Sequence, residues 1–231
     1  MVMTHEPLAL REYSLKLVEQ SSIMDNIGLS GRLGVAIYLL EYSRIFAQKS
    51  FLSIGEQLVS DVIENISLDS SGVNCQDGIL SVGVGIAYLY DRGFIQGDAD
   101  EVLAEIDELV QYTIDFRSLS NEHIGNNLCG LLFYLYLRIK KRTDRTLALF
   151  RNREYLIYAI DWVEDLYAQN NALDDKFYTL LCLLHNTKVY PTKTNFLLST
   201  LLENISSQNK FYSEIDLLGI VHLSMLQLWC R

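Results

Sequence analysis

Proline and cysteine are both scarce in this sequence of 231 residues. The two prolines are Pro7 and Pro191, and a proline-free interval of that length is one that helices allow and many short turns do not. The four cysteines, at positions 75, 129, 182 and 230, are spread roughly fifty residues apart, which is not the density of a disulfide-stapled fold. We therefore expect an all-α protein of a reducing cytoplasm.

Positive charge and long hydrophobic runs are also in short supply. The chain has 29 acidic and 19 basic residues, a net charge of -10, which would not attract a phosphate-coated partner. No apolar stretch reaches the ~18 residues of a membrane span, and residues 1–17 lack the basic and apolar regions of a signal peptide. We expect no nucleic-acid partner, no membrane span and no signal peptide.

Apolar residues, by contrast, are abundant. They make up 49% of the sequence, which is ample for the core of a single domain spanning residues 1–231. Within 58–66 and 102–110 they recur at the three- and four-residue spacing of one helix face. This pattern supports the all-α prediction.

A glycine-led repeat organises the chain. Three glycine clusters each precede an apolar run that contains a Tyr-Leu step, at residues 38–39, 88–89 and 134–135. The clusters contain eight of the thirteen glycines: Gly28, Gly31 and Gly34; Gly78, Gly83 and Gly85; Gly125 and Gly130. Weaker copies follow at 177–185 and 217–226. A repeat of about 45 to 50 residues is typical of stacked helix pairs.

The repeat predicts two layers of helices. The glycine-led helices are apolar nearly all round, so neighbours should surround them. Their amphipathic partners should form an outer layer, at 52–66, 99–115, 153–168 and 193–206, after an opening helix near 9–20. About five helix pairs result. They would form either a ring or an open solenoid.

Glycine at the start of an inner helix has two physical explanations. It permits close approach of neighbouring backbones and a positive-φ entry turn where several helices begin near one axis. The same helix starts present free N–H groups that attract a carbonyl or an anion. Packing alone would also explain these glycines.

Two segments resemble lanthionine synthetase C-like proteins, whose domain is an α/α toroid. They are GLSGRLGVAIYLLEY, which opens with the Gly-Leu-x-Gly motif, and DGILSVGVGIAYLYDRGFIQGDADEVLAEID. The likeness is strongest over residues 25–140. It implies a toroid, here a short one that forms either a compact ring or an open arc, and a bacterial role in peptide modification.

The resemblance also implies zinc-dependent cyclase chemistry, but the zinc ligands are missing. Active members of the family bind zinc through two cysteines and a histidine, with one cysteine directly before the histidine. This chain has no Cys-His pair; Cys129 precedes Gly130, and Cys230 is followed only by Arg231. We therefore expect no metal and no cofactor, and a peptide-binding or accessory protein whose partner is a peptide, a modified peptide or a modification enzyme.

The candidate peptide-binding residues lie mostly where the inner helices begin. We predict that Asp77, His123, Asn126 and Asn127 surround a peptide carbonyl or carboxylate and that Tyr88 lines the groove. Helix capping would also explain the two asparagines. No catalytic residue can be assigned from the sequence.

Three further patterns have simpler explanations. Cys182 and His185 share a helix face but lie in an apolar run, as buried residues do. His222 is best interpreted as a core histidine. Asp98, Asp100 and Glu101 suit the cap and first turn of a helix better than a calcium loop.

Two other functions stay open. The first is an α/α-toroid hydrolase that cleaves glycans with a carboxylic acid and a carboxylate, for which Asp77, Glu122 and Asp216 are the candidates. The second is a helical-repeat interaction scaffold without catalytic activity.

Overall fold

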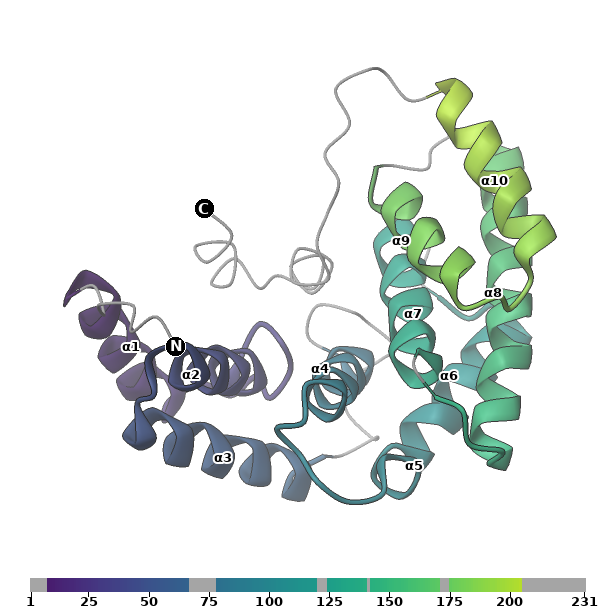
Figure 1. The fold of residues 1–231 in the computed structure, drawn as a ribbon. Helices are drawn as coiled ribbons and strands as arrows, with labels where there is room; N and C mark the ends of the chain where they lie inside the picture. Colours follow the sequence, from purple (N-terminus) through teal and green to yellow (C-terminus); the bar gives the residue numbers. More distant parts are fainter. Residues whose placement is uncertain (1–7, 67–77, 120–123, 141, 171–174, 205–231) are drawn as a thin grey trace.

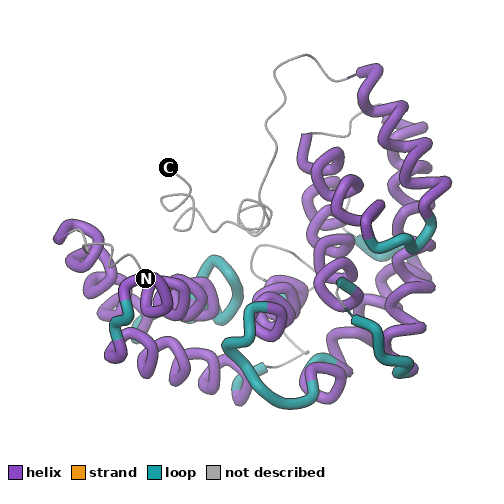
Figure 2. The backbone as a smooth tube through the Cα atoms, in the orientation of Figure 1, coloured by secondary structure: helices purple, strands orange, loops and turns teal. Residues whose placement is uncertain are grey.

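The structure is a computed structural model that describes residues 8–66, 78–119, 124–140, 142–170 and 175–204. Within these ranges the chain forms helices and no strand, which confirms the all-α prediction (Figure 2). The helices are α1 Leu8–Ser21, α2 Arg32–Phe46, α3 Lys49–Glu64, α4 Ile79–Asp91, α5 Ala99–Val102, α6 Ala104–Phe116, α7 Ile124–Ile139, α8 Leu147–Asn170, α9 Asp175–Asn186 and α10 Pro191–Asn204.

The helices form two layers along an arc (Figure 1). In the inner layer, α2 packs on α4, α4 on α7, and α7 on α9. In the outer layer, α3 packs on α2, α6 on α4 and α8, and α10 on α8 and α9. A closed toroid stays a prediction, because the segment 217–226, which was predicted to be a fifth inner helix, lies outside the described residues.

Burial separates the two layers as the apolar pattern predicts. Nearly every residue of α2, α4 and α7 is buried, including the rings of Tyr38, Tyr88 and Tyr134. The outer helix α3 buries one face only, through Phe51, Gly55, Leu58, Val59 and Val62. Each large apolar side chain removed from water in this way stabilises the fold by about 1.5–3 kcal/mol.

Close approach explains four of the motif glycines. A Cβ atom at Gly28 would lie 2.1 Å from Ser81 Oγ, and one at Gly31 would lie 1.8 Å from the backbone oxygen of Asn26. On α4, a Cβ at Gly83 would lie 2.7 Å from Ile106 Cγ2, and one at Gly85 would lie 2.4 Å from Leu33 Cδ2. Gly34, Gly78 and Gly130 are also buried. A Cβ at Gly125 would have 3.9 Å to its nearest neighbour, so packing does not require glycine there.

The predicted positive-φ entry turn is wrong for two of these glycines. Gly31 has φ -128° and Gly78 has φ -86°. Side chains organise these entries instead: Asn26 Oδ1 accepts a hydrogen bond from Gly28 N, and Ser81 Oγ donates one to Gly78 O. Positive φ occurs at Gly93 and Gly97, in the turn that follows α4.

The outer helix predicted at 99–115 is interrupted. The short helix α5 ends at Val102, and Leu103, which is fully buried, separates it from α6. Asp98 caps α5 as predicted, since its Oδ1 accepts a hydrogen bond from Asp100 N. Asp100 of α5 contacts Arg138 of α7.

None of the described helices combines the length and the apolar character that crossing a membrane requires.

Candidate functional site

A buried carboxylate links α6 to α7. Asp107 of α6 accepts hydrogen bonds from the Tyr134 hydroxyl at 2.6 Å and from Arg138 Nη2 at 2.6 Å. Asn152 Nδ2 of α8 approaches the same carboxylate at 3.3 Å. We call Asp107, Tyr134, Arg138 and Asn152 the α7 clamp. Because the Arg138 side chain is only 2% exposed, this clamp is an interior ion pair.

The α7 clamp continues toward the surface through Asp100. Arg138 Nη2 donates to Asp100 Oδ1 at 2.7 Å, and Arg142 donates to both oxygens of Asp100, at 2.6 and 2.8 Å. Arg142 also pairs with Asp144. Paired N–H donors facing both oxygens of a carboxylate hold it in one orientation. The first turn of α5 is thereby fixed against the end of α7.

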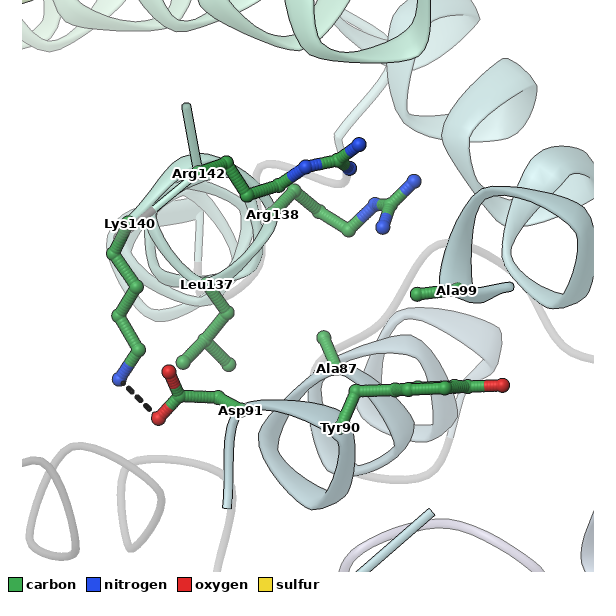
Figure 3. Close-up of a pocket in the computed structure, with 8 residues that line it drawn as sticks. All are labelled: Ala87, Tyr90, Asp91, Ala99, Leu137, Arg138, Lys140 and Arg142. Atoms are coloured by element: carbon green, nitrogen blue, oxygen red, sulfur yellow. Dashed lines mark ion pairs between the residues drawn. The ribbon is translucent and has the colours of Figure 1, made fainter. Parts of the chain in front are cut away.

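A pocket of about 200 Å³ lies beside this network, between the C-terminal ends of α4 and α7. In Figure 3 the side chains of Arg138 and Arg142 extend toward Ala99, and Tyr90 extends from α4 on the facing side. The lining residues are Ala87, Tyr90, Asp91, Ala99, Leu137, Arg138, Lys140 and Arg142. At one edge Lys140 Nζ pairs with Asp91 Oδ2 at 2.9 Å. We call this cavity the α4–α7 pocket.

The pKa shifts around the α4–α7 pocket keep Asp100 and Arg138 charged and keep Tyr90 neutral. Hydrogen bonds from Arg142, followed by those from Arg138, lower the pKa of Asp100 although burial opposes this. Burial is the largest single influence on Arg138 and disfavours its charge, but its hydrogen bonds to Asp107 and Asp100 and the nearby negative charge together outweigh burial and raise its pKa. Burial, followed by the charge of Asp98, raises the pKa of Tyr90. None of these shifts moves a group toward pH 7, where general acid–base catalysis works best. The arrangement suits binding.

A second, similar cluster links α2 to α4. The Tyr88 hydroxyl and Arg92 Nε donate to Glu41 Oε1 at 2.8 and 3.0 Å, and Arg44 pairs with the same carboxylate. We call Glu41, Tyr88, Arg92 and Arg44 the α4 clamp. The Arg44 guanidinium also lies 4.8 Å from the ring centroid of Phe94. Each clamp therefore joins consecutive helix pairs of the repeat.

Among the described residues, none of those predicted to bind peptide lines the α4–α7 pocket. Tyr88 is 1% exposed and belongs to the α4 clamp. Asn126 and Asn127 lie in the first turn of α7, which begins at Ile124, and not at its N-cap. Asp77 and His123 lie outside the described residues. The α4–α7 pocket is at the opposite ends of these helices.

The structure describes only some of the residues considered for hydrolysis or metal binding. Glu122, Asp216 and His222 lie outside the described residues. Cys182 of α9 is half-buried, and the Nδ1 atom of His185 on the same helix is buried. Across the described ranges, no group of three or more His, Cys, Asp and Glu side chains is placed to hold a metal ion.

The α7 clamp was not predicted as a site, although a repeated motif in the sequence marks two of its residues. Tyr-Leu-Tyr-x-Arg occurs at 88–92 and again at 134–138. In both copies the first tyrosine and the arginine, one helical turn apart, hold a carboxylate of an earlier helix. Extending the Tyr-Leu match by three residues would have identified both arginines.

Comparison with known proteins adds no relative: no protein-family model, no curated protein and no solved structure matches the chain. The resemblance to lanthionine synthetase C-like proteins therefore rests on the two quoted segments, residues 28–42 and 77–107.

Proposed function

We propose that this chain is a lanthionine synthetase C-like helical-repeat protein that binds a peptide and lacks zinc-dependent cyclase activity, as an accessory in peptide modification. The observation that carries the binding part of the proposal is the α4–α7 pocket, with its fixed charges and the Tyr90 hydroxyl. The missing Cys-His pair supports the part concerning zinc.

The size and polarity of the α4–α7 pocket suit one residue of a peptide. Its volume of about 200 Å³ is below the roughly 300–1,000 Å³ of sites that enclose a whole small molecule. Arg142 and Lys140 can donate hydrogen bonds to peptide carbonyls, and Asp91 can accept them from peptide N–H groups. Because ion pairs already orient these side chains, a peptide would bind with little further ordering.

A pocket-filling variant tests peptide binding. Ala99 lines the α4–α7 pocket, so Ala99→Leu would occupy part of it. Ala168→Leu, on an exposed position of α8, is the matched control. Fluorescence anisotropy would measure the binding of three labelled 20-residue peptides, one rich in Ser, Thr and Cys, one in Lys and one in Glu. We expect the first peptide to bind, and Ala99→Leu to weaken it about tenfold, or about 1.4 kcal/mol. Equal binding by both variants would contradict a role for the pocket.

A separate assay tests the absence of cyclase activity. The substrate is a synthetic peptide that contains one dehydroalanine and one cysteine, and loss of the free thiol is followed with and without added zinc. We expect the rate with the protein to equal the rate without it. Zinc-dependent thiol loss above that background would show a cyclase and overturn this part of the proposal.

A further inference from the structure

A second surface, on the outer layer, combines exposed aromatic rings with carboxylates. Tyr112 and Phe116 of α6 are exposed, with ring centroids 4.6 Å apart. Tyr158 of α8 is exposed, and its ring meets that of Tyr155 edge-on at 5.8 Å. The Tyr155 hydroxyl donates to Asp115 Oδ2 at 2.9 Å, which joins the two helices. Exposed rings grouped in this way are typical of interaction surfaces.

On this helix pair, the side chain of Arg117 shows how the surface holds a cation. Arg117, directly after α6, places its guanidinium 6.0 Å from the ring centroid of Trp162 and pairs with Asp165 at 2.7 Å. Trp162 and Asp165 both belong to α8. An aromatic face next to a carboxylate is therefore an arrangement that attracts a guanidinium on this surface.

A related arrangement, in which a tyrosine hydroxyl donates to the neighbouring carboxylate, occurs twice on this surface. Tyr155 lies beside Asp115, and the Tyr158 hydroxyl donates to Glu154 at 2.9 Å. Among the described residues no basic side chain forms an ion pair with Asp115 or Glu154. The hydrogen bond to Glu154, followed by its charge, raises the pKa of Tyr158.

We propose that the outer face of α6 and α8 docks a basic segment of a partner protein, whose Arg or Lys side chains cover Tyr155 and Tyr158 and pair with Asp115 and Glu154. The overall charge of -10 favours the approach of such a segment. It disfavours a second copy of this chain, which carries the same charge. This surface is separate from the α4–α7 pocket, so the proposal does not depend on peptide binding there.

Binding of a defined peptide tests the proposal. The probe is a labelled 16-residue peptide with an arginine at every fourth position in an alanine background. Matched probes carry glutamine or glutamate at those positions. We expect the arginine peptide to bind and the other two to bind at least tenfold more weakly. Equal binding of the glutamine peptide would overturn the charge-based docking.

Variants locate the binding on this surface. Asp115→Asn with Glu154→Gln should weaken the arginine peptide about tenfold, and Tyr158→Leu should weaken it several-fold. The control, Glu12→Gln with Glu19→Gln on exposed positions of α1, changes the net charge equally and should leave binding within twofold. Equal losses in both double variants would show attraction by net charge alone and overturn the proposal.

Two further measurements complete the test. Circular dichroism would establish that each variant keeps its helix content; the substituted side chains are exposed or half-buried, so we expect no loss. Sedimentation of the protein alone should show a monomer. A dimer that Tyr158→Leu dissociates would place a second copy on this surface and overturn the assignment to a basic partner. Ala99→Leu should bind the arginine peptide normally, which separates this result from the test of the α4–α7 pocket.

Discussion

The α4 clamp and the α7 clamp share the motif Tyr-Leu-Tyr-x-Arg but differ in their exposure to water. In the α4 clamp, Arg44 and Arg92 are 39% and 38% exposed, whereas Glu41 between them is 6% exposed. In the α7 clamp, Arg138 is 2% exposed and Asp107 7% exposed. The difference comes from the surroundings, because α5 and α8 cover the α7 clamp with Asp100 and Asn152. Both carboxylates are buried, but one local motif pairs them with partly exposed arginines at one repeat and with a buried arginine at the next.

The two environments predict different energetics for the same chemistry. An exposed ion pair contributes about 0–1 kcal/mol, because water and salt screen it. A buried pair need not stabilise the fold much in total, since removing both charges from water opposes its attraction. Removing only one partner, however, leaves an uncompensated charge in the interior. The α7 clamp should therefore be far more sensitive to single substitutions.

The largest effect should come from Arg138→Met. The variant leaves Asp107 buried without its guanidinium, and we expect a loss of about 3–5 kcal/mol in the free energy of unfolding, measured by urea denaturation. The matched change in the other clamp, Arg92→Met, should cost less, about 1–2 kcal/mol, because Arg92 is partly exposed and the buried Glu41 keeps Arg44 and the Tyr88 hydroxyl as partners. Similar losses in both variants would break the comparison. Adding Asp107→Asn to Arg138→Met should recover part of the loss, because the buried charge is then removed.

Gly83→Ala should disturb the α7 clamp through packing. The added methyl group would lie 2.7 Å from Ile106 Cγ2 and 3.0 Å from the Tyr134 ring, and overpacking of this kind costs about 1–3 kcal/mol. In Gly125→Ala the nearest atom is 3.9 Å away, so that variant should be unchanged or more stable by up to about 1 kcal/mol. Urea denaturation measures both. A stable Gly83→Ala protein would show that Tyr134 can move without consequence.

Loss of one tyrosine hydroxyl should have a smaller effect. Tyr134→Phe removes the donor of the 2.6 Å hydrogen bond to Asp107, and we expect a loss of about 1.5 kcal/mol. Tyr88→Phe removes the corresponding bond to Glu41, whose carboxylate keeps two arginine partners, and should cost about 0.5 kcal/mol. Thermal unfolding would compare the two. A larger loss in Tyr88→Phe than in Tyr134→Phe would show that the exposure of the arginines does not determine how sensitive each clamp is to substitution.

The sequence predicted the helices and the layers well, because both depend on local apolar spacing. The all-round apolarity of residues 79–89 and 128–137 correctly identified inner helices. The cap at Asp98 was predictable for the same reason, since its partner, Asp100 N, is two residues away.

The α4–α7 pocket was not predicted, because it depends on contacts between distant residues. Asp100 meets Arg138 and Arg142 across 38 and 42 positions. The break at Leu103, between α5 and α6, leaves no sign in the sequence, because leucine also suits a helix interior. Reasoning from helix N-termini pointed to Asn126 and Asn127, whereas the polar pocket lies where α4 and α7 end.

Acid should act on the α7 clamp through Asp100 and have the smallest effect of the four. A carboxyl whose pKa is lowered by folding stabilises the protein above its unfolded pKa of about 3.9, and this stabilisation is lost as the pH falls further. The arginines around Asp100 lower its pKa and stay charged throughout. Asp100→Asn should therefore flatten the fall in unfolding free energy between about pH 5 and about pH 2. Asp165→Asn removes a pair exposed on both sides and should leave that slope unchanged. An unaltered slope in Asp100→Asn would mean that Arg142 holds α5 in place without depending on the charge of its partner.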